Sequence, residues 1–298
     1  MSTTPPAASV ILPAYRSQRT IAASLRALET QSFQDFETIV VDSSPDEQTA
    51  EEVRRFPDVQ LVLAGRRMLP HEARNLGAAR AKGSILVFTD PDCAARPDWL
   101  ERVVALHKDG WEVAGGAVEP MPGWWNRALH WTRYGWWMTG GPVSTRPEIP
   151  SANQSFSRKI WENLGGYHSD CFASDSEICW RAQAEGKAIR FDPDAVVVHD
   201  HPFTFAQFVR DRWSRGRDFA QLRLTSRGWS RSTAAIRVLA APLGPIMMTA
   251  RAGSFAVESG RVLEWAAFAP VQWFGHSLWC LGEARELAAR IAGSGWMR

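Results

Sequence analysis

Short apolar runs alternate with helical segments between Ala8 and Asp90, and this alternation constrains the fold more than any other feature of the chain. The runs are typical of buried strands and lie at 8–13, 36–41, 59–64 and 85–89. Strands that alternate with helices predict a parallel sheet with helices on both faces. Because right-handed crossovers bring the carboxyl ends of such strands to one edge, we expect the residues after each run to meet in one cleft.

Two carboxylates, Asp90 and Asp92, follow the fourth run. Placed together at a strand end, they repel each other unless a cation or a hydroxyl-rich ligand lies between them. Carboxylate oxygens are hard ligands that suit Mg²⁺ or Mn²⁺, and these ions bind phosphate oxygens. The pair therefore predicts a metal-assisted nucleotide site. The alternative is a loop that only caps the next helix, with Asp92 or Asp98 near its start.

Composition narrows the class of protein. The 298 residues are 45% hydrophobic and 22% charged, which is ordinary for a globular chain with a substantial core. The formal net charge is +2, and basic residues cluster only in 210–231, which disfavours a nucleic-acid partner. The first nine residues lack the charged-then-apolar pattern of a signal peptide. No C-x-x-C pair occurs, so we expect reduced cytosolic thiols at Cys93, Cys171, Cys179 and Cys280.

The character of the chain changes after residue 203. Aromatic and aliphatic residues of 205–222 recur at helical spacing among arginines, which is typical of a basic amphipathic helix on an anionic membrane or of a helix packed on the domain. Apolar stretches follow at 234–250 and 262–282, each interrupted by proline and charged or polar residues. We expect membrane-lying or re-entrant helices, or a pair that forms a homodimer, rather than true spans.

Tryptophan is unusually frequent. The chain has 15 tryptophans, and five of them lie between Trp124 and Trp137, in a segment, 123–147, without a strong period. Such rings suit a membrane interface or an apolar ligand groove. An interface with another protein is the alternative.

Four short motifs follow one another in order: VILPAY at Val10–Tyr15, IVVDSS at Ile39–Ser44, ARNLG at Ala73–Gly77 and FTDPD at Phe88–Asp92. A Ser174-Asp175-x-Glu177 segment with Arg181 follows, and then a strand that ends at His199. Together these motifs resemble the family 2 glycosyltransferases, over roughly residues 8–202. The resemblance implies a GT-A fold at 8–203, which is a Rossmann-like α/β domain with a mostly parallel sheet and flanking helices. A Trp-rich acceptor-side insertion would occupy 123–150, and an amphipathic and apolar helical region 204–298.

The resemblance also implies a nucleotide-sugar donor in the strand-end cleft, most often a UDP-sugar in this family, with a GDP-sugar as the alternative. The residues implied in donor binding are Pro13, Ala14, Tyr15, Asp42, Arg74 and Asp90. Asp42 would accept from the ring N–H of the base, and Asp90 would bond the ribose hydroxyls. Asp92 would hold Mn²⁺ or Mg²⁺, which neutralises the diphosphate. His199 would contact metal or phosphate, or would instead be a buried structural histidine.

Asp175 is the general base that the resemblance implies, and the expected outcome is inversion at the anomeric carbon. The alternative is that Asp175 only caps a helix. Glu177 and Arg181 lie four residues apart and could form an ion pair. The residues expected on the acceptor side are Trp124, Trp125, Asn153, Ser174 and Glu177.

The chain departs from the family pattern at several positions, and these departures narrow what the resemblance implies. Ser43-Ser44-Pro45 replaces the usual residues after Asp42, and Ser174 replaces the usual glutamate before Asp175. The Gln-x-x-Arg-Trp block of processive synthases does not occur, so we expect single transfers.

The sequence therefore predicts a metal-dependent inverting glycosyltransferase at the cytoplasmic face of the inner membrane, peripheral or re-entrant. Its acceptor would be lipid-linked, a glycan or a hydrophobic small molecule. A nucleotidyltransferase is disfavoured because the loop at 13–17 lacks glycine. A non-catalytic membrane or interaction protein is disfavoured because Asp42, Asp90, Asp92 and Asp175 occur together.

Overall fold

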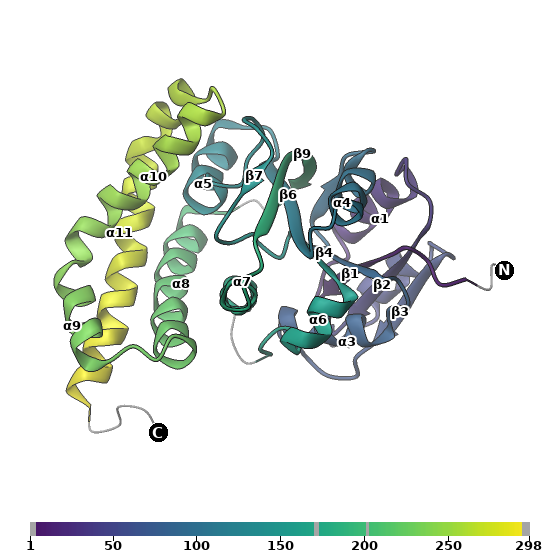
Figure 1. The fold of residues 1–298 in the computed structure, drawn as a ribbon, viewed down its shortest axis with the longest axis horizontal. Helices are drawn as coiled ribbons and strands as arrows, with labels where there is room; N and C mark the ends of the chain where they lie inside the picture. Colours follow the sequence, from purple (N-terminus) through teal and green to yellow (C-terminus); the bar gives the residue numbers. More distant parts are fainter. Residues whose placement is uncertain (1–3, 170–172, 201–202, 294–298) are drawn as a thin grey trace. The chain divides into compact units, whose positions relative to one another are not determined.

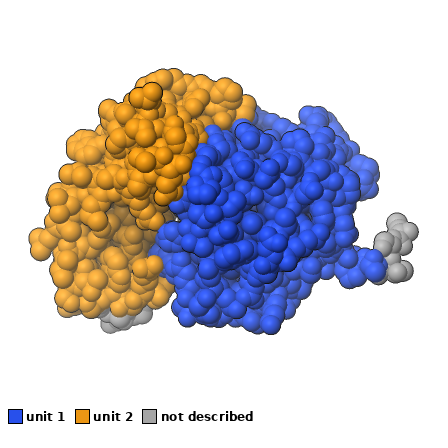
Figure 2. Space-filling model, turned by 45° about the horizontal axis from the view of Figure 1, so that its top comes forward, with its two compact units in different colours: residues 1–119, 137–201 blue, residues 120–136, 202–298 orange. Residues whose placement is uncertain are grey.

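The computed structural model describes residues 4–169, 173–200 and 203–293. The chain forms two compact units, shown in blue and orange in Figure 2. The first joins residues 1–119 to 137–201, and the second joins 120–136 to 202–298. Residues 120–136, at the start of the Trp-rich segment, thus cluster with the C-terminal helices.

The first unit begins with the parallel half of a sheet, in the order β3-β2-β1-β4 (Figure 1). Its strands are β1 (Ala8–Ala14), β2 (Phe36–Asp42), β3 (Val59–Leu63) and β4 (Ile85–Thr89). The helices between them are α1 (Ile21–Glu29), α2 (Gln48–Val53) and α3 (Pro70–Arg80), the last with proline at its first position. These elements confirm the strand–helix alternation expected from the sequence.

Antiparallel strands extend the sheet beyond β4 in the order β8-β6-β9-β5. They are β5 (Cys93–Ala95), β6 (Val113–Pro120), β8 (Asn153–Ser157) and β9 (Ile189–His199), with the short β7 (Ser144–Thr145) paired to β9. The helices of this half are α4 (Trp99–Lys108), α6 (Arg158–Leu164) and α7 (Ser174–Ala184). The predicted α/β fold class is confirmed, but the sheet, expected to be mostly parallel, is parallel only in β1–β4 and pairs antiparallel beyond β4.

The strand that ends at His199, β9, is long and runs through Pro193 without a break. On one side of β9, pairing with β7 ends at Phe191 and pairing with β5 begins at Val197. Proline has no N–H to donate, and Pro193 lies between these two pairings, outside both.

An aromatic cluster forms much of the core on one face of the sheet. Phe88 of β4 lies 4.8 Å from the ring of Trp161 on α6 and 5.2 Å from that of Tyr167. Phe156 of β8 packs on the same two rings. α6 begins where the Ser157 side chain accepts from the backbone N–H of Ile160, so its start is set by an ordinary N-cap.

The second unit is helical. It contains α5 (Trp124–Tyr134), α8 (Phe205–Ser226), α9 (Arg231–Leu239), α10 (Gly244–Glu258) and α11 (Val262–Ala292), with a 3₁₀ turn at Ala241–Leu243. α11 packs against α5, α8, α9 and α10. A Cβ at Gly216 of α8 would lie 2.0 Å from the carbonyl oxygen of Trp279 on α11, so these two helices meet at backbone contact. The segment 123–147, which shows no strong period in the sequence, contains the helix α5.

The arginines of α8 are largely used inside the second unit. Arg212 is buried and donates to the carbonyl of Gly275 at 3.4 Å, and Arg217 pairs with Glu286 at 3.2 Å. Arg223 pairs with the buried Glu283. These contacts favour the alternative that α8 is a packed helix rather than a membrane-facing one.

Within the described residues, no single helix combines the length and apolar composition needed to cross a membrane. α9 and the following segment to Glu258 meet the criterion only together, and they are bent by 51° at their junction.

Candidate active site

The carboxyl ends of β1 and β2 lie side by side. In the parallel register Pro13 pairs with Val41 and Ala14 with Asp42. Asp42 is buried, and its Oδ1 accepts the backbone N–H of Ser44 at 2.9 Å. The backbone N–H of Ser43 donates to the carbonyl of Ala14 at 2.9 Å. The structure therefore brings Pro13, Ala14 and Asp42 together, as the strand-end argument required.

The loop after β1 is fastened to the loop after β2. The backbone N–H of Arg16 donates to Ser44 Oγ at 2.8 Å, and Arg16 has a φ of 53°. A left-handed backbone at a residue other than glycine is strained, and such strain is common at functional sites. The Arg67 guanidinium lies 4.9 Å from the centre of the Tyr15 ring. The sequence analysis missed Arg67, although the strand-end rule applied to β3 selects the segment that contains it.

A buried cation compensates Asp90. Arg74, on α3, is 2% exposed, and its Nη2 contacts Asp90 Oδ1. Its Nη1 lies 3.4 Å from His71 Nδ1, and the His71 ring packs against Tyr167. A buried guanidinium needs a counter-charge, and Asp90 supplies it. Arg74, which belongs to the motif at Ala73–Gly77, thus contacts the acidic pair from its position on α3.

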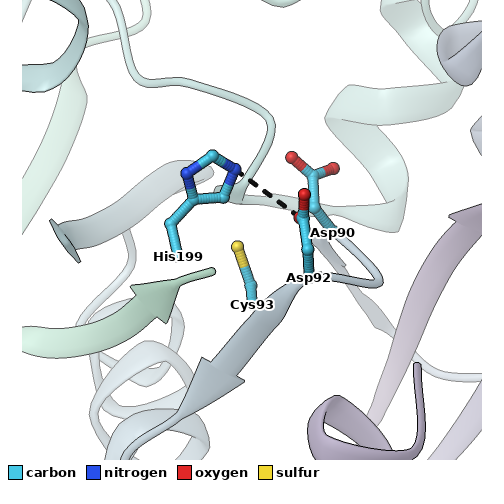
Figure 3. Close-up of side chains that lie close together, drawn as sticks. All are labelled: Asp90, Asp92, Cys93 and His199. Atoms are coloured by element: carbon cyan, nitrogen blue, oxygen red, sulfur yellow. Dashed lines mark ion pairs between the residues drawn. The ribbon is translucent and has the colours of Figure 1, made fainter. Parts of the chain in front are cut away.

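Asp92 meets residues from the other half of the sheet (Figure 3). Cys93, the first residue of β5, pairs with His199 at the end of β9. His199 Nε2 lies 3.5 Å from Asp92 Oδ1. The candidate ligand atoms of Asp90, Asp92, Cys93 and His199 all lie within 4.8 Å of one another. Such a grouping is the size of a single cation site.

The donor set fits a hard divalent cation. Burial, together with the charges of Asp92 and Asp90, raises the pKa of the Cys93 thiol well above its ordinary value. A thiol binds metal only as the thiolate, so the two carboxylates and the imidazole are the groups suited to the ion. Carboxylate oxygens favour Mg²⁺ or Mn²⁺ over softer metals. The chemistry of these side chains therefore agrees with the Asp92 and His199 assignments made from sequence.

Asp175 lies in the first turn of α7. Its Oδ2 accepts the backbone N–H of Ser151 at 3.2 Å, and its Oδ1 accepts that of Ser176 at 2.9 Å. The N-cap position is Ala173, so Asp175 is not the capping residue of this helix. It is half-buried.

A second carboxylate lies beside α7 and was missed by the sequence analysis. Glu148 Oε2 accepts from Ser176 Oγ at 2.8 Å, and its Oε1 accepts from Trp180 Nε1 at 3.0 Å. It comes from the loop before β8, far along the chain from Asp175. Ser176 links the two acids, because its N–H bonds Asp175 and its hydroxyl bonds Glu148. Ser174 stands where the family pattern has a glutamate, and this missing carboxylate was the signal in the sequence that another acid could lie beside Asp175.

The remaining acceptor-side predictions have different outcomes. Glu177 is buried and pairs with Arg181 at 2.7 Å, as the spacing predicted, so its carboxylate serves the fold. Arg181 also donates to the carbonyl of Gly166 at 2.7 Å. Ser174 is fully buried at the start of α7. Trp124 and Trp125 lie on α5 in the second unit, and their place on the acceptor side stays a prediction.

Asn153 is a correction to the sequence analysis, which placed it on the acceptor side. It is 0% exposed, and its Oδ1 accepts from Trp99 Nε1 at 2.9 Å. Its Nδ2 donates to the carbonyls of Ala117 and Ala195 at 2.9 and 2.8 Å. The amide therefore joins β8 to its neighbours inside the fold and cannot reach an acceptor.

Asn153→Ala should lower the free energy of unfolding by about 3 kcal/mol, because it leaves a buried indole N–H and two buried carbonyls without their partner. Urea unfolding of the full chain measures this loss. Asn126→Ala is the matched control, since Asn126 makes only an exposed bond to Pro122. Equal stability of the two variants would contradict the structural role of Asn153.

Comparison with protein families gives one family for this chain. Residues 9–180 match the family described as glycosyl transferase family 2. The glycosyltransferase AglE of Haloferax volcanii is 26% identical over 209 residues, which cover 67% of this chain and 68% of that protein. The pre-mycofactocin glycosyltransferase of Mycobacterium tuberculosis is 28% identical over 204 residues, 65% of this chain and 42% of that protein. This chain thus spans about two thirds of the first relative and less than half of the second.

A solved structure supports the fold. The mannosyltransferase PcManGT from Pyrobaculum calidifontis, in complex with GDP-Man and Mn²⁺, superposes with a TM-score of 0.63 and 22% sequence identity. The match covers 96% of this chain and 88% of that one. With the family match over more than half of its length and this shared architecture, the chain belongs to the family 2 glycosyltransferases and has the GT-A fold.

Proposed function

We propose that this enzyme moves one sugar from a nucleoside diphosphate sugar to an acceptor hydroxyl, with inversion of the anomeric carbon. The observation that carries the proposal is the grouping of Asp90, Asp92 and His199 at the strand ends, on the sheet edge that also holds Asp42. The diphosphate leaves with negative charge, and a cation bound next to the nucleotide would stabilise that charge.

The donor base belongs at the ends of β1 and β2. Asp42 keeps one oxygen on the backbone of Ser44, which holds its carboxylate in a fixed orientation toward a ring N–H of uracil or guanine. Pro13, Ala14 and Tyr15 would border the base, and Asp90 would bond the ribose hydroxyls. Arg74, which contacts Asp90, would lie near the base or the phosphates. A UDP-sugar is the family's usual donor, whereas PcManGT was solved with GDP-Man. Both nucleotides have the N–H that Asp42 accepts.

The metal belongs between Asp92 and His199. When bound, Mn²⁺ or Mg²⁺ neutralises the diphosphate charge and acts as a Lewis acid. His199 is held by the pairing of β9 with β5, and Asp92 by the backbone bond from Asp200 to its carbonyl at 2.7 Å. The two side chains therefore come from rigid positions, as a metal site requires.

Asp92→Asn should weaken donor nucleotide binding in Mn²⁺ at least tenfold, because a neutral amide is a poorer ligand for a hard cation. In excess EDTA the variant and the wild type should bind the nucleotide equally weakly. Calorimetric titration measures both affinities. Asp98→Asn, at the start of α4, is the matched control and should bind as the wild type does; unchanged metal-dependent affinity in Asp92→Asn would remove Asp92 from the metal site.

Asp175 is the proposed base, which takes the proton of the acceptor hydroxyl as its oxygen attacks the anomeric carbon. Asp175→Asn should lower kcat by about 10²–10⁴, the usual contribution of a general base, and leave the donor dissociation constant unchanged. The measurement is transfer rate together with donor titration. Asp109→Asn, at an exposed site, controls for loss of charge. Normal turnover in Asp175→Asn would leave the carboxylate with a structural role only.

Glu148 is a proposed positioning residue, because it holds Ser176 and, through the N–H of Ser176, the carboxylate of Asp175. Glu148→Gln replaces one of its two acceptor oxygens by a donor. We expect kcat to fall about tenfold to a hundredfold, because a small displacement of a catalytic group lowers the rate by this much. The donor dissociation constant should stay unchanged. Glu112→Gln, which breaks the Lys187 ion pair at the surface, is the control. Equal kcat for both variants would contradict the proposal.

The acceptor is proposed to be lipid-linked, a glycan or a hydrophobic small molecule, and the enzyme to work at the cytoplasmic face of the inner membrane. Large exposed apolar side chains on the second unit support this location. Single transfers are expected, since the sequence lacks the block that processive synthases carry.

A further inference from the structure

A set of large apolar side chains in the second unit is exposed along α9, the 3₁₀ turn and the start of α10. Leu239 is 81% exposed and Ile236 66%. We call this set the elbow face; it consists of Ile236, Leu239, Leu243, Ile246 and Met247. Isolated exposed aliphatic residues are ordinary, but five within twelve positions form a patch of the kind that marks an interaction surface.

Helical spacing places these side chains on one continuous surface. Successive members are three or four residues apart, except for the adjacent Ile246 and Met247, so they line neighbouring turns on both sides of the 51° bend. The opposite side of the same segment is anchored within the unit. Arg237 donates to the buried Glu283 of α11 at 2.8 Å, and Gly244 lies against Cys280. These contacts with α11 therefore hold the segment so that the elbow face points outward.

The charges around the elbow face have one sign. Between Phe219 and Val257 the chain contains five arginines and no aspartate or glutamate. Two of the five, Arg223 and Arg237, pair with Glu283. Arg227, Arg231 and Arg251 are exposed, and the Arg251 guanidinium also lies 3.9 Å from the centre of the Trp136 ring. An apolar surface on a segment that carries arginines and no acid between 219 and 257 is complementary to a bilayer with anionic headgroups.

A second copy of the chain fits this surface less well. Homodimers are mostly built on a two-fold axis, where the same patch meets itself. The three exposed arginines of one copy would then face those of the other, and no acidic residue in 219–257 would offset them. A span of the bilayer is also disfavoured, since α9 has 9 residues and the bend follows it directly.

We propose that the elbow face docks on an anionic membrane surface, with its aliphatic side chains in the boundary between headgroups and acyl chains. Arg227, Arg231 and Arg251 lie against the lipid phosphates. The helices lie in the interface and do not cross it. This mode of binding brings the enzyme to a lipid-linked acceptor but does not depend on donor chemistry, so it fails or holds independently of the proposed transfer reaction.

Vesicle sedimentation of the full chain tests the proposal. Vesicles of phosphatidylcholine are compared with vesicles to which phosphatidylglycerol has been added, at low and high salt. We expect binding to the anionic vesicles that weakens as salt rises. Leu239→Gln/Ile246→Gln should reduce the partition coefficient at least about tenfold. Arg227→Gln/Arg231→Gln should reduce it about fivefold for each arginine removed.

The control makes the same change elsewhere. Leu63→Gln/Val143→Gln removes two exposed aliphatic side chains from the first unit and should bind vesicles as the wild type does. Because the substituted positions are exposed, we expect each variant to fold. Circular dichroism melts check this. The proposal is overturned by absence of binding to anionic vesicles, or by equal binding of the wild type and Leu239→Gln/Ile246→Gln. It is also overturned if ultracentrifugation shows a dimer that this double variant disrupts while vesicles stay unbound.

Discussion

Two carboxylates at the end of one buried strand repel each other, and the groups that offset this repulsion organise the site. Asp90 receives the buried guanidinium of Arg74 from α3, and Asp92 receives the imidazole of His199 from β9. These partners come from opposite halves of the sheet. The parallel half carries Asp42 and the antiparallel half carries His199, so the acidic pair is the point where the two halves meet.

The first half of the fold could be predicted because its signals are local. Apolar runs followed by helical periods fix β1 to β4 and the helices between them, and strand-end geometry then brings Asp42 and Asp90 to one edge. The family resemblance assigned Asp92 and His199 to one metal site, and the two side chains lie 3.5 Å apart. Even the Glu177–Arg181 ion pair followed from spacing along one helix.

Other features depend on contacts that the sequence does not display. Asn153 resembles an exposed polar residue after a loop, but carbonyls of two strands, β6 and β9, and the indole of Trp99 use its side-chain amide. Glu148 lies outside every motif and reaches α7 only because the loop before β8 folds over that helix's first turn. The Trp-rich segment has a weak period because the five consecutive residues 128–132 of α5 are all buried, which hides its helical character.

The central claim is that a divalent cation and a nucleoside diphosphate bind together at the strand-end site. Calorimetric titration of the wild-type protein with UDP, GDP, CDP and dTDP, with and without Mn²⁺, tests it most directly. We expect one nucleotide to bind much more tightly than the other three, and only when Mn²⁺ is present. Binding of none of the four, or an affinity that Mn²⁺ leaves unchanged, would contradict the account.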